Sequence, residues 1–247
     1  MGTVEHKLEK VLGGAVPAAS LVLHVAALSA AGEVLRIQHD TPRSELDFFL
    51  LNAARARSDA ILTTGRILRE EPELRHEIQG APEDVEALLG WREGALRKGE
   101  PPFLIVLSSG RDLDPRHPAF ATSTRPVVYT AEARVMALRR TLPGEVMVVG
   151  DTAPSLRRAL AFTRSQLGAQ TISVEAGPST ALSLYDDPLQ IDELWLSEYL
   201  EAEVPATLLG ARFLAPSALD SLLPTRSRAE HAQASGRWRF TRRSRTP

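Results

Sequence analysis

The segment Thr171-Ile172-Ser173-Val174-Glu175-Ala176-Gly177-Pro178-Ser179-Thr180 combines a carboxylate, a turn and hydroxyl groups at the end of an apolar run. Gly177 permits a sharp turn or a close approach of the backbone to a ligand, and Pro178 suits the first turn of a helix. The free N–H groups that follow, with the hydroxyls of Ser179 and Thr180, form a corner that favours anions. Because Glu175 stands beside this corner, the segment predicts a site for a phosphorylated ligand.

Two other interpretations of this segment stay open. It fits an ordinary junction between a strand and a helix, in which Gly and Ser serve only as turn and cap. It also nearly matches the G-x-S-x-G nucleophile elbow of serine hydrolases, with Ala181 in place of the last glycine. Such a hydrolase needs a histidine after the nucleophile, and the single histidine after Ser179 is His231, in a polar tail rich in Ser and Arg.

Composition excludes several classes of function. The chain of 247 residues has no cysteine, which excludes disulfides, thiolate chemistry and Cys-ligated zinc. Its net charge of −2 provides no strong field for nucleic acid. The basic tail, residues 237–245, alternates aromatic and basic residues, which favours a final strand over a nucleic-acid site. The nucleotide motifs G-x-G-x-x-G and Walker A are absent, as is the metal motif H-E-x-x-H.

The beginning of the chain has two interpretations. Residues 11–32 carry almost no charge, so a signal peptide is the alternative. The mixture of acids and bases over residues 4–10 is unlike the basic start of a signal peptide, and Pro17 and His24 interrupt the apolar run. We therefore expect a helix and linker over residues 1–20, then one domain over residues 21–247, in the cytoplasm.

Strand-like and helix-like patterns alternate along that domain. This alternation predicts an α/β fold with a mainly parallel sheet, helices on both faces and a final antiparallel strand, and ligands then bind at the carboxyl ends of strands. Residues from about 76 to 100 form a charged helical excursion. The expected strands are 21–28, 60–63, 103–107, 127–130, 146–149, 172–174, 193–199 and the tail, and the expected helices are 44–57, 82–98, 131–140, 155–167 and 179–185.

Several segments, in one order, resemble the reductase domain of riboflavin biosynthesis. The resemblance covers nearly all of the chain beyond residue 20 and lies in residues 55–63, 68–74, 102–113, 174–179, 192–194 and 208–210. It implies a dihydrofolate-reductase-like fold that uses NADPH to reduce a ribosylamino-pyrimidine phosphate or a related pyrimidine or pterin. Because a zinc deaminase domain needs Cys ligands, the chain is expected to be a stand-alone reductase.

The resemblance also implies roles for particular residues. Arg55 binds the substrate phosphate, Glu175 is the catalytic residue that also hydrogen-bonds the substrate, and Leu74 with Arg75 lines the substrate. Separately from the resemblance, Arg66 or Arg111 is available for the 2′-phosphate of the cofactor, so we expect a preference for NADPH over NADH. The implied cofactor-binding residues are Ala27, Arg66, Glu70, Ser109, Gly177, Pro178, Ser179 and Thr180, and no metal ligand is expected.

The chain departs from the family at some positions. Ala31 stands where the family has an Asp, Ala176 replaces a Gly, and the family's Gly-Thr-Val becomes Arg66-Ile67-Leu68, which loses its Thr. Ala31 and the lost Thr favour, as the alternative, a reductase-fold protein that binds a nucleotide without this catalysis. The resemblance further implies a homodimer that pairs through late strands, since residues 193–200 are apolar on both faces around Trp195. Helices of the same chain could equally cover those faces.

Overall fold

The computed structural model describes residues 3–17, 21–36, 40–111, 113–121, 124–201 and 204–245. The end of the expected linker, residues 18–20, and Asp112 of the resembling segment lie outside these ranges. Within them, one helix precedes the sheet: α1 (Val4–Leu12) begins at Thr3, whose hydroxyl accepts from the N–H of His6. It ends at Gly13, whose φ of 71° is readily adopted by glycine.

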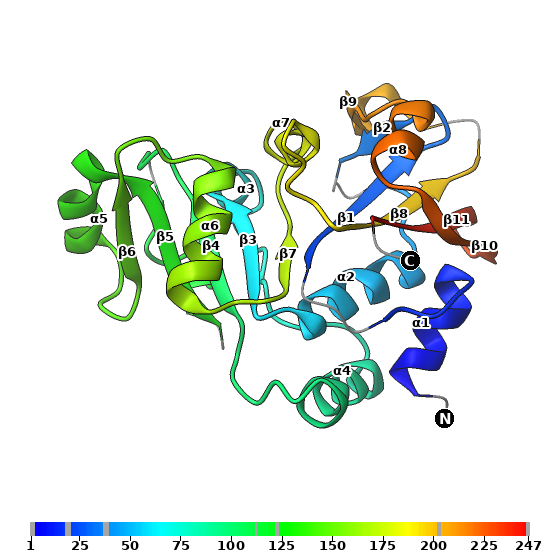
Figure 1. Cartoon of the computed structure of the whole chain (residues 1–247), viewed down its shortest axis with the longest axis horizontal. Helices are drawn as coiled ribbons and strands as arrows, with labels where there is room; N and C mark the ends of the chain where they lie inside the picture. Colours follow the sequence, from blue (N-terminus) through cyan, green and yellow to red (C-terminus); the bar gives the residue numbers. More distant parts are fainter. Residues whose placement is uncertain are drawn as a thin grey trace.

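In the described residues, eleven strands form one connected sheet (Figure 1). Nine of them lie in the spatial order β10-β11-β8-β1-β7-β3-β4-β5-β6, while β2 (Glu33–Leu35) pairs with β1 and β9 (Leu209–Arg212) pairs with β2. All neighbours from β8 to β6 are parallel, whereas β11 runs antiparallel to β8 and to β10. The strands on this path are β1 (Val22–Ser29), β3 (Ala60–Thr64), β4 (Phe103–Leu107), β5 (Arg125–Ala131), β6 (Met147–Asp151), β7 (Ile172–Val174), β8 (Glu193–Tyr199), β10 (Thr225–Gln233) and β11 (Gly236–Ser244).

Helices cover both faces of the sheet, as predicted. One face carries α1, α2 (Glu45–Arg57) and α4 (Pro82–Gly90) against β1, β8 and β11, and further along it α3 (Gly65–Glu70) and α5 (Val135–Thr141) against β3 to β6. The other face carries α6 (Leu156–Leu167), the turn after α7 (Pro178–Ala181), and α8 (Pro216–Leu222). Serine hydroxyls cap two of these helices: Ser44 accepts from Asp47 N at the start of α2, and Ser155 accepts from Arg158 N at the start of α6.

The chain order breaks where β7 inserts between β1 and β3. From this break the sheet continues through β3 to β6 on one side and through β8, β11 and β10 on the other (Figure 1). Carboxyl ends of parallel strands that meet at such a break form a crevice suited to ligands. The segment that follows β7, which begins with Glu175, therefore lies where this architecture favours binding.

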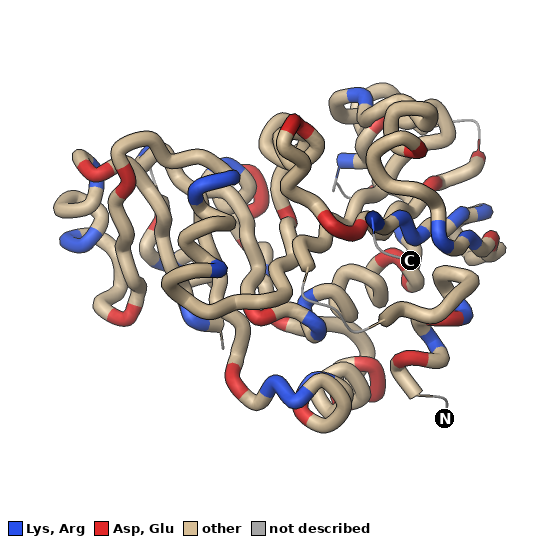
Figure 2. The backbone as a smooth tube through the Cα atoms, in the orientation of Figure 1, with Lys and Arg blue, Asp and Glu red and all other residues tan. Residues whose placement is uncertain are grey.

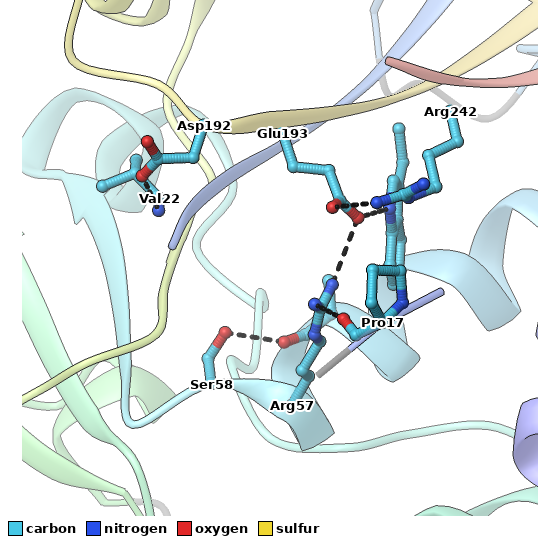
Figure 3. Close-up of polar contacts among 9 residues, drawn as sticks. Pro17, Val22, Arg57, Ser58, Asp192, Glu193 and Arg242 are labelled. Carbon is cyan, nitrogen blue, oxygen red and sulfur yellow. Dashed lines mark hydrogen bonds and ion pairs between the residues drawn. The ribbon is translucent and has the colours of Figure 1, made fainter. Parts of the chain in front are cut away.

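A buried ion cluster around Glu193 lies at the amino end of β8, opposite the carboxyl ends where ligands are expected (Figure 3). Its carboxylate accepts from Arg57 at 3.2 Å, from Arg242 at 3.0 Å and from the indole of Trp195 at 2.5 Å. Arg57 also donates to the carbonyl of Pro17, which ties the first linker to α2. All four charged or aromatic side chains are at most 5% exposed, so the cluster joins elements of the fold and is closed to ligands.

Trp195 corrects one premise of the expected homodimer. The side chain is 0% exposed within the single chain, in a core shared with α1 and α2. Helices of the same chain therefore cover this strand, which was the alternative. The homodimer itself stays a prediction.

Some elements differ from the expectation. Two helices, α3 and α8, and three strands, β2 (Glu33–Leu35), β9 (Leu209–Arg212) and β10, were not predicted. Three of the expected α-helices contain a part with another helical geometry. The five residues Trp91–Ala95 after α4 form a π-helix, and Glu132–Arg134 and Leu182–Tyr185 form 3-10 helices. Further 3-10 turns are Pro118–Phe120 and Ala206–Leu208. Among the described residues, no helix is long and apolar enough to cross a membrane.

The basic tail forms the predicted final strand. In Figure 2, Lys and Arg positions, coloured blue on the backbone, recur along β10 and β11. Several have carboxylate partners within the chain: Arg237 meets Glu201, Arg239 meets Glu230, and Arg243 meets Asp220. These arginines therefore form ion pairs within the chain, on the sheet and its surface.

Candidate functional site

A groove of about 280 Å³ lies at the carboxyl ends of β3 and β4, beside α3 and α7. It brings together three of the residues expected to bind a cofactor, Arg66, Ser109 and Thr180. A larger hollow of about 420 Å³ lies near the amino ends of β4 and β5 and contains none of the expected residues. The residues that line the groove are Thr64, Gly65, Arg66, Arg69, Leu107, Ser108, Ser109, Pro154 and Thr180.

The floor of this groove depends on Gly65. A Cβ atom at this position would lie 2.9 Å from Ser108 Oγ and 3.1 Å from Leu113 Cδ2, so the two loops approach as closely as they do because a side chain is missing. Thr64 caps α3 by accepting from Ile67 N at 3.3 Å, and Ser108 accepts from Gly110 N at 3.0 Å. The walls are therefore held by hydrogen bonds, and hydroxyl groups line the space between them.

Two arginines give the groove its positive charge. Arg66 pairs with Glu70 at 2.7 Å, but both side chains are more than half exposed, so this ion pair contributes little and an anion can replace the carboxylate. Arg69 donates to the carbonyl of Arg111 at 3.3 Å. In this arrangement Glu70 holds Arg66 and is not among the lining residues, although it was expected to contact the cofactor. Arg69 was missed, although the Thr-Thr-Gly-Arg run after a buried strand was a signal for this loop.

The backbone of the turn after β7 does not require the glycine that the sequence suggested. Gly177 has φ −58° and ψ 157°, and a Cβ atom added to it would meet nothing within 4 Å, so the turn itself does not require glycine. Its carbonyl accepts from Thr180 N and Ala181 N, both at 2.9 Å, so those N–H groups are already used. The expected anion corner thus has fewer free donors, and α7 is a single turn from Pro178 to Ala181. A close ligand approach at Gly177, Pro178 and Ser179 stays a prediction.

Arg55 and Glu175 form a bidentate ion pair. Arg55 Nε donates to Glu175 Oε1 at 2.9 Å and Nη2 donates to Oε2 at 2.7 Å, while Nη1 donates to the carbonyl of Glu77 at 2.9 Å. The side chains are 2% and 10% exposed. Burial alone would raise the pKa of Glu175, but the adjacent guanidinium lowers it below its ordinary value, so the carboxylate is ionised at neutral pH.

This pairing bears on the role expected for Arg55. A guanidinium fork binds a carboxylate or a phosphate with the same two donors, and in this structure Glu175 occupies it. The pair as a whole is electrically balanced. Arg55 therefore positions Glu175 in this structure, and its contact with a substrate phosphate stays a prediction.

The segment Glu71–Gly80, which we call the strap, runs beside this ion pair. Gln79 N donates to Asn52 Oδ1 at 2.7 Å, and this bond joins the strap to α2. Leu74 is half-buried in it, whereas Arg75 points to the surface, where it pairs with Glu77 at 3.3 Å. The following residue, His76, is fully buried and was not singled out from the sequence.

Two further positions lie at the carboxyl end of β1. Ala27 is partly buried against the core that contains α2, and it pairs with Ser197 of β8. Ala31 is exposed in the turn that follows the strand, where its carbonyl accepts from Arg212. Contacts of either residue with a cofactor or substrate stay predictions.

The serine-hydrolase interpretation has no geometric support. His231 lies on β10, where its Nε2 meets the carbonyl of Val11 at 3.2 Å and its ring packs against Phe240. Ser179 follows β7, which is separated from β10 by β11, β8 and β1. At about 4.8 Å between neighbouring strands, four steps place the two elements roughly 19 Å apart. In the part of the chain that the structure describes, no cluster of three or more His, Asp or Glu residues could hold a metal ion.

No family profile matches the sequence, and no curated protein sequence matches it. Solved structures do match. A pyrimidine reductase-like protein from Corynebacterium diphtheriae superposes with a TM-score of 0.66 at 20% identity, over 98% of each chain. Riboflavin Biosynthesis Reductase Rib7 from Saccharomyces cerevisiae gives a TM-score of 0.59 at 12% identity, over 98% of this chain and 99% of that one. RibD from Acinetobacter baumannii gives 0.62 at 13% identity, over 92% of this chain and 58% of that one.

The chain has the fold of these reductases. The match extends over nearly its full length and confirms the predicted α/β class, a mainly parallel sheet with helices on both faces and antiparallel strands at the end. At these identities the similarity is one of fold, and fold alone does not assign chemistry.

Proposed function

We propose that this protein is an NADPH-dependent reductase of a ribosylamino-pyrimidine phosphate, of the 5-amino-6-(5-phosphoribosylamino)uracil type, or of a related pyrimidine or pterin. The observation that carries the proposal is the groove, which gathers Arg66, Ser109 and Thr180 at the carboxyl ends of parallel strands. The fold shared with reductases supports it.

The residues of the groove fit a dinucleotide phosphate. Gly65 lets its backbone lie close to Ser108 and Leu113. The hydroxyls of Ser109 and Thr180 can donate to phosphate oxygens, and Arg66 and Arg69 add positive charge to the groove. NADPH, when bound, supplies the hydride. The 2′-phosphate that distinguishes it from NADH is expected to meet Arg66 and Arg69.

Glu175 provides the polar contact for the substrate. Arg55 keeps the carboxylate ionised and fixes its plane, so the lone pairs that Arg55 does not use can accept a hydrogen bond from a substrate N–H or O–H group. The chain positions the reacting groups and orients them.

One observation favours the alternative, a reductase-fold protein that binds the nucleotide without this reaction. Glu175 occupies the fork of Arg55, so the cation expected for the substrate phosphate is already paired. The homodimer and the cytoplasmic location also remain proposals.

Two measurements on the purified protein separate these functions. Calorimetry with NADPH and NADH tests cofactor binding, and we expect clear heat with NADPH and weaker binding of NADH. Turnover of the ribosylaminouracil phosphate, followed by loss of NADPH absorbance, tests catalysis. Binding without turnover would establish the alternative, and the absence of heat with either nucleotide would exclude both functions.

A further inference from the structure

His76 is a fully buried histidine without a protein partner for its ring. Its exposed fraction is 0%, and neither Nδ1 nor Nε2 has a hydrogen-bond partner among the described residues. Buried polar atoms are nearly always hydrogen-bonded, because an unpaired one has lost its hydration without compensation. A neutral imidazole presents one N–H donor and one bare acceptor. The ring can therefore form hydrogen bonds with a ligand group that carries both an acceptor and a donor.

His76 directly precedes Glu77, whose backbone carbonyl accepts from Arg55 Nη1 at 2.9 Å, so the strap places this histidine beside the Arg55–Glu175 pair. Burial lowers the pKa of His76 to about 4, and the charges of Glu175 and Arg55 act on it in opposite directions. At neutral pH the ring is uncharged, and so is the ion pair as a whole. The site that these residues form thus suits an uncharged polar group and is poorly suited to a phosphate.

The strap holds the ring in this position from both sides. After His76, the carbonyl of Glu77 accepts from Arg55 and Gln79 N donates to Asn52, so the strap is bound to α2. Before it, the carbonyl of Glu71 meets Nε2 of His117 at 3.1 Å. His117 Nδ1 accepts from Ala119 N at 3.0 Å, which assigns the proton of that ring to Nε2. Both ring nitrogens of His117 thus form hydrogen bonds with the backbone, whereas neither ring nitrogen of His76 does.

Two hydroxyls on the same face of the sheet are unpaired as well. Ser173 and Glu175 alternate with the core-facing Ile172 and Val174 and so point to the face that carries α2. Thr63, on the neighbouring strand β3, shares that face with Ile61. Within the described residues, Thr63 Oγ1 and Ser173 Oγ have no hydrogen-bond partner. These two unpaired hydroxyls therefore lie on the side of the sheet where Glu175 is held.

We propose that His76 is a substrate-binding residue which, with Glu175, recognises an uncharged heterocyclic amide edge of the substrate. The proposal rests on the proposed function and adds a residue that determines specificity. Because the ring has no exposed surface here, the contact requires the strap to shift away from α2 as the ligand enters. The imidazole accepts from one ring N–H of the ligand or donates to its carbonyl, and Glu175 accepts from a second N–H.

The test uses two substitutions at His76 and one matched control. In His76→Phe the polar atoms are removed with little change in shape, and in His76→Gln a donor and an acceptor are kept. His231→Phe is the control, because His231 is a partly buried histidine whose ring is hydrogen-bonded, to Val11, far from this site. For each variant the urea midpoint, the Kd of NADPH and the KM of the ribosylaminouracil phosphate are measured.

We expect His76→Phe to unfold at the same urea concentration as the wild type or a higher one, because it removes unsatisfied polar atoms. Its substrate KM should rise about tenfold or more, with the Kd of NADPH unchanged, and His76→Gln should recover part of the loss. His231→Phe should lose stability and keep the wild-type KM. A less stable His76→Phe with an unchanged KM would show a purely structural residue and overturn the proposal.

A binding measurement distinguishes failure of this proposal from failure of the proposed function. If the wild type does not turn over the phosphorylated substrate, uracil serves as a probe of the amide edge in calorimetry. Uracil binding that is weakened about tenfold or more in His76→Phe supports the role of His76 even then. No uracil binding to the wild type, or equal binding to both proteins, overturns it.

Discussion

Arg55, near the end of α2, and Glu175, directly after β7, are 120 positions apart in the chain and meet through two parallel hydrogen bonds. Each side chain would be a buried charge without the other. The pair thereby fixes the carboxylate at the break in the sheet, beside the strap. Its energetic and functional roles can be separated by substitution.

Removal of one partner of this pair should be strongly destabilising. Arg55→Ala leaves the Glu175 carboxylate buried without its cation, and we expect a loss of about 3–5 kcal/mol in the free energy of unfolding. The double variant Arg55→Met with Glu175→Leu should recover most of that loss. Urea denaturation measures both, with Arg116→Ala as control, because Arg116 is 89% exposed. Equal stability of Arg55→Ala and the wild type would contradict the buried ion pair.

The stability of the protein should fall as the pH decreases from 6.5 towards 4. Burial lowers the pKa values of His24 and His76 to about 4, so the unfolded chain binds more protons than the folded one in this window. We expect each of these two histidines to lower the free energy of unfolding by about 2 kcal/mol between pH 7 and pH 5. The loss from Glu175 comes later, below its unfolded pKa, because Arg55 lowers the folded value.

Urea denaturation at pH 7 and pH 5 measures this effect in the wild type and in the double variant His24→Gln with His76→Gln. The variant should lose much less stability over the same interval. Parallel pH profiles of the two proteins would show that these histidines do not titrate with the expected shift.

Gly65 and Gly177 form a matched pair for testing the cofactor groove. In Gly65→Ala the new methyl group must displace Ser108, so NADPH affinity should fall about tenfold or more. In Gly177→Ala it meets nothing and the backbone angles suit alanine, so the free energy of unfolding should change by less than about 0.5 kcal/mol. Calorimetry and urea denaturation give the two values. An unchanged NADPH affinity in Gly65→Ala would place the cofactor elsewhere.

The preference for NADPH should depend on Arg66 and Arg69. A charge-assisted contact to a phosphate is worth about 1.5–3 kcal/mol, so the double alanine variant should bind NADPH about tenfold or more weakly. Its affinity for NADH, which lacks the 2′-phosphate, should hardly change. Arg116→Ala again provides the control. Equal losses for both nucleotides would show that these arginines contact another part of the cofactor.

The homodimer is tested by light scattering at micromolar concentration. The chain mass is 26.9 kDa, and a dimer should give twice that value. Trp195→Glu would not test the interface, because Trp195 is 0% exposed and a buried carboxylate would unfold the chain. A monomeric mass would exclude the expected pairing through late strands.

Strong local signals allowed much of the fold to be predicted. The strands β4, β7 and β8 have the predicted bounds. The residues of β4 form a continuous apolar run, which is typical of a strand buried on both faces. In contrast, β10 was missed, because its residues alternate between exposed and half-buried and carry few apolar side chains. Its pairing with β11 and its contact with α1 decide that it is a strand, and neither can be read from its own sequence.

The sequence by itself determined that Glu175 ends a buried strand, that Arg55 lies near the end of a helix, and that Arg66, Ser109 and Thr180 follow or begin elements of a parallel sheet. Only the tertiary structure decided that Arg55 holds Glu175, since the packing of α2 on the sheet, where it contacts β1, selects its partner. The same holds for His76, which lies in a charged segment typical of a surface but is turned inwards by the bonds between the strap and α2. Chain order specifies which residues leave the strands at one edge, whereas side-chain partners depend on packing between elements that are distant in the sequence.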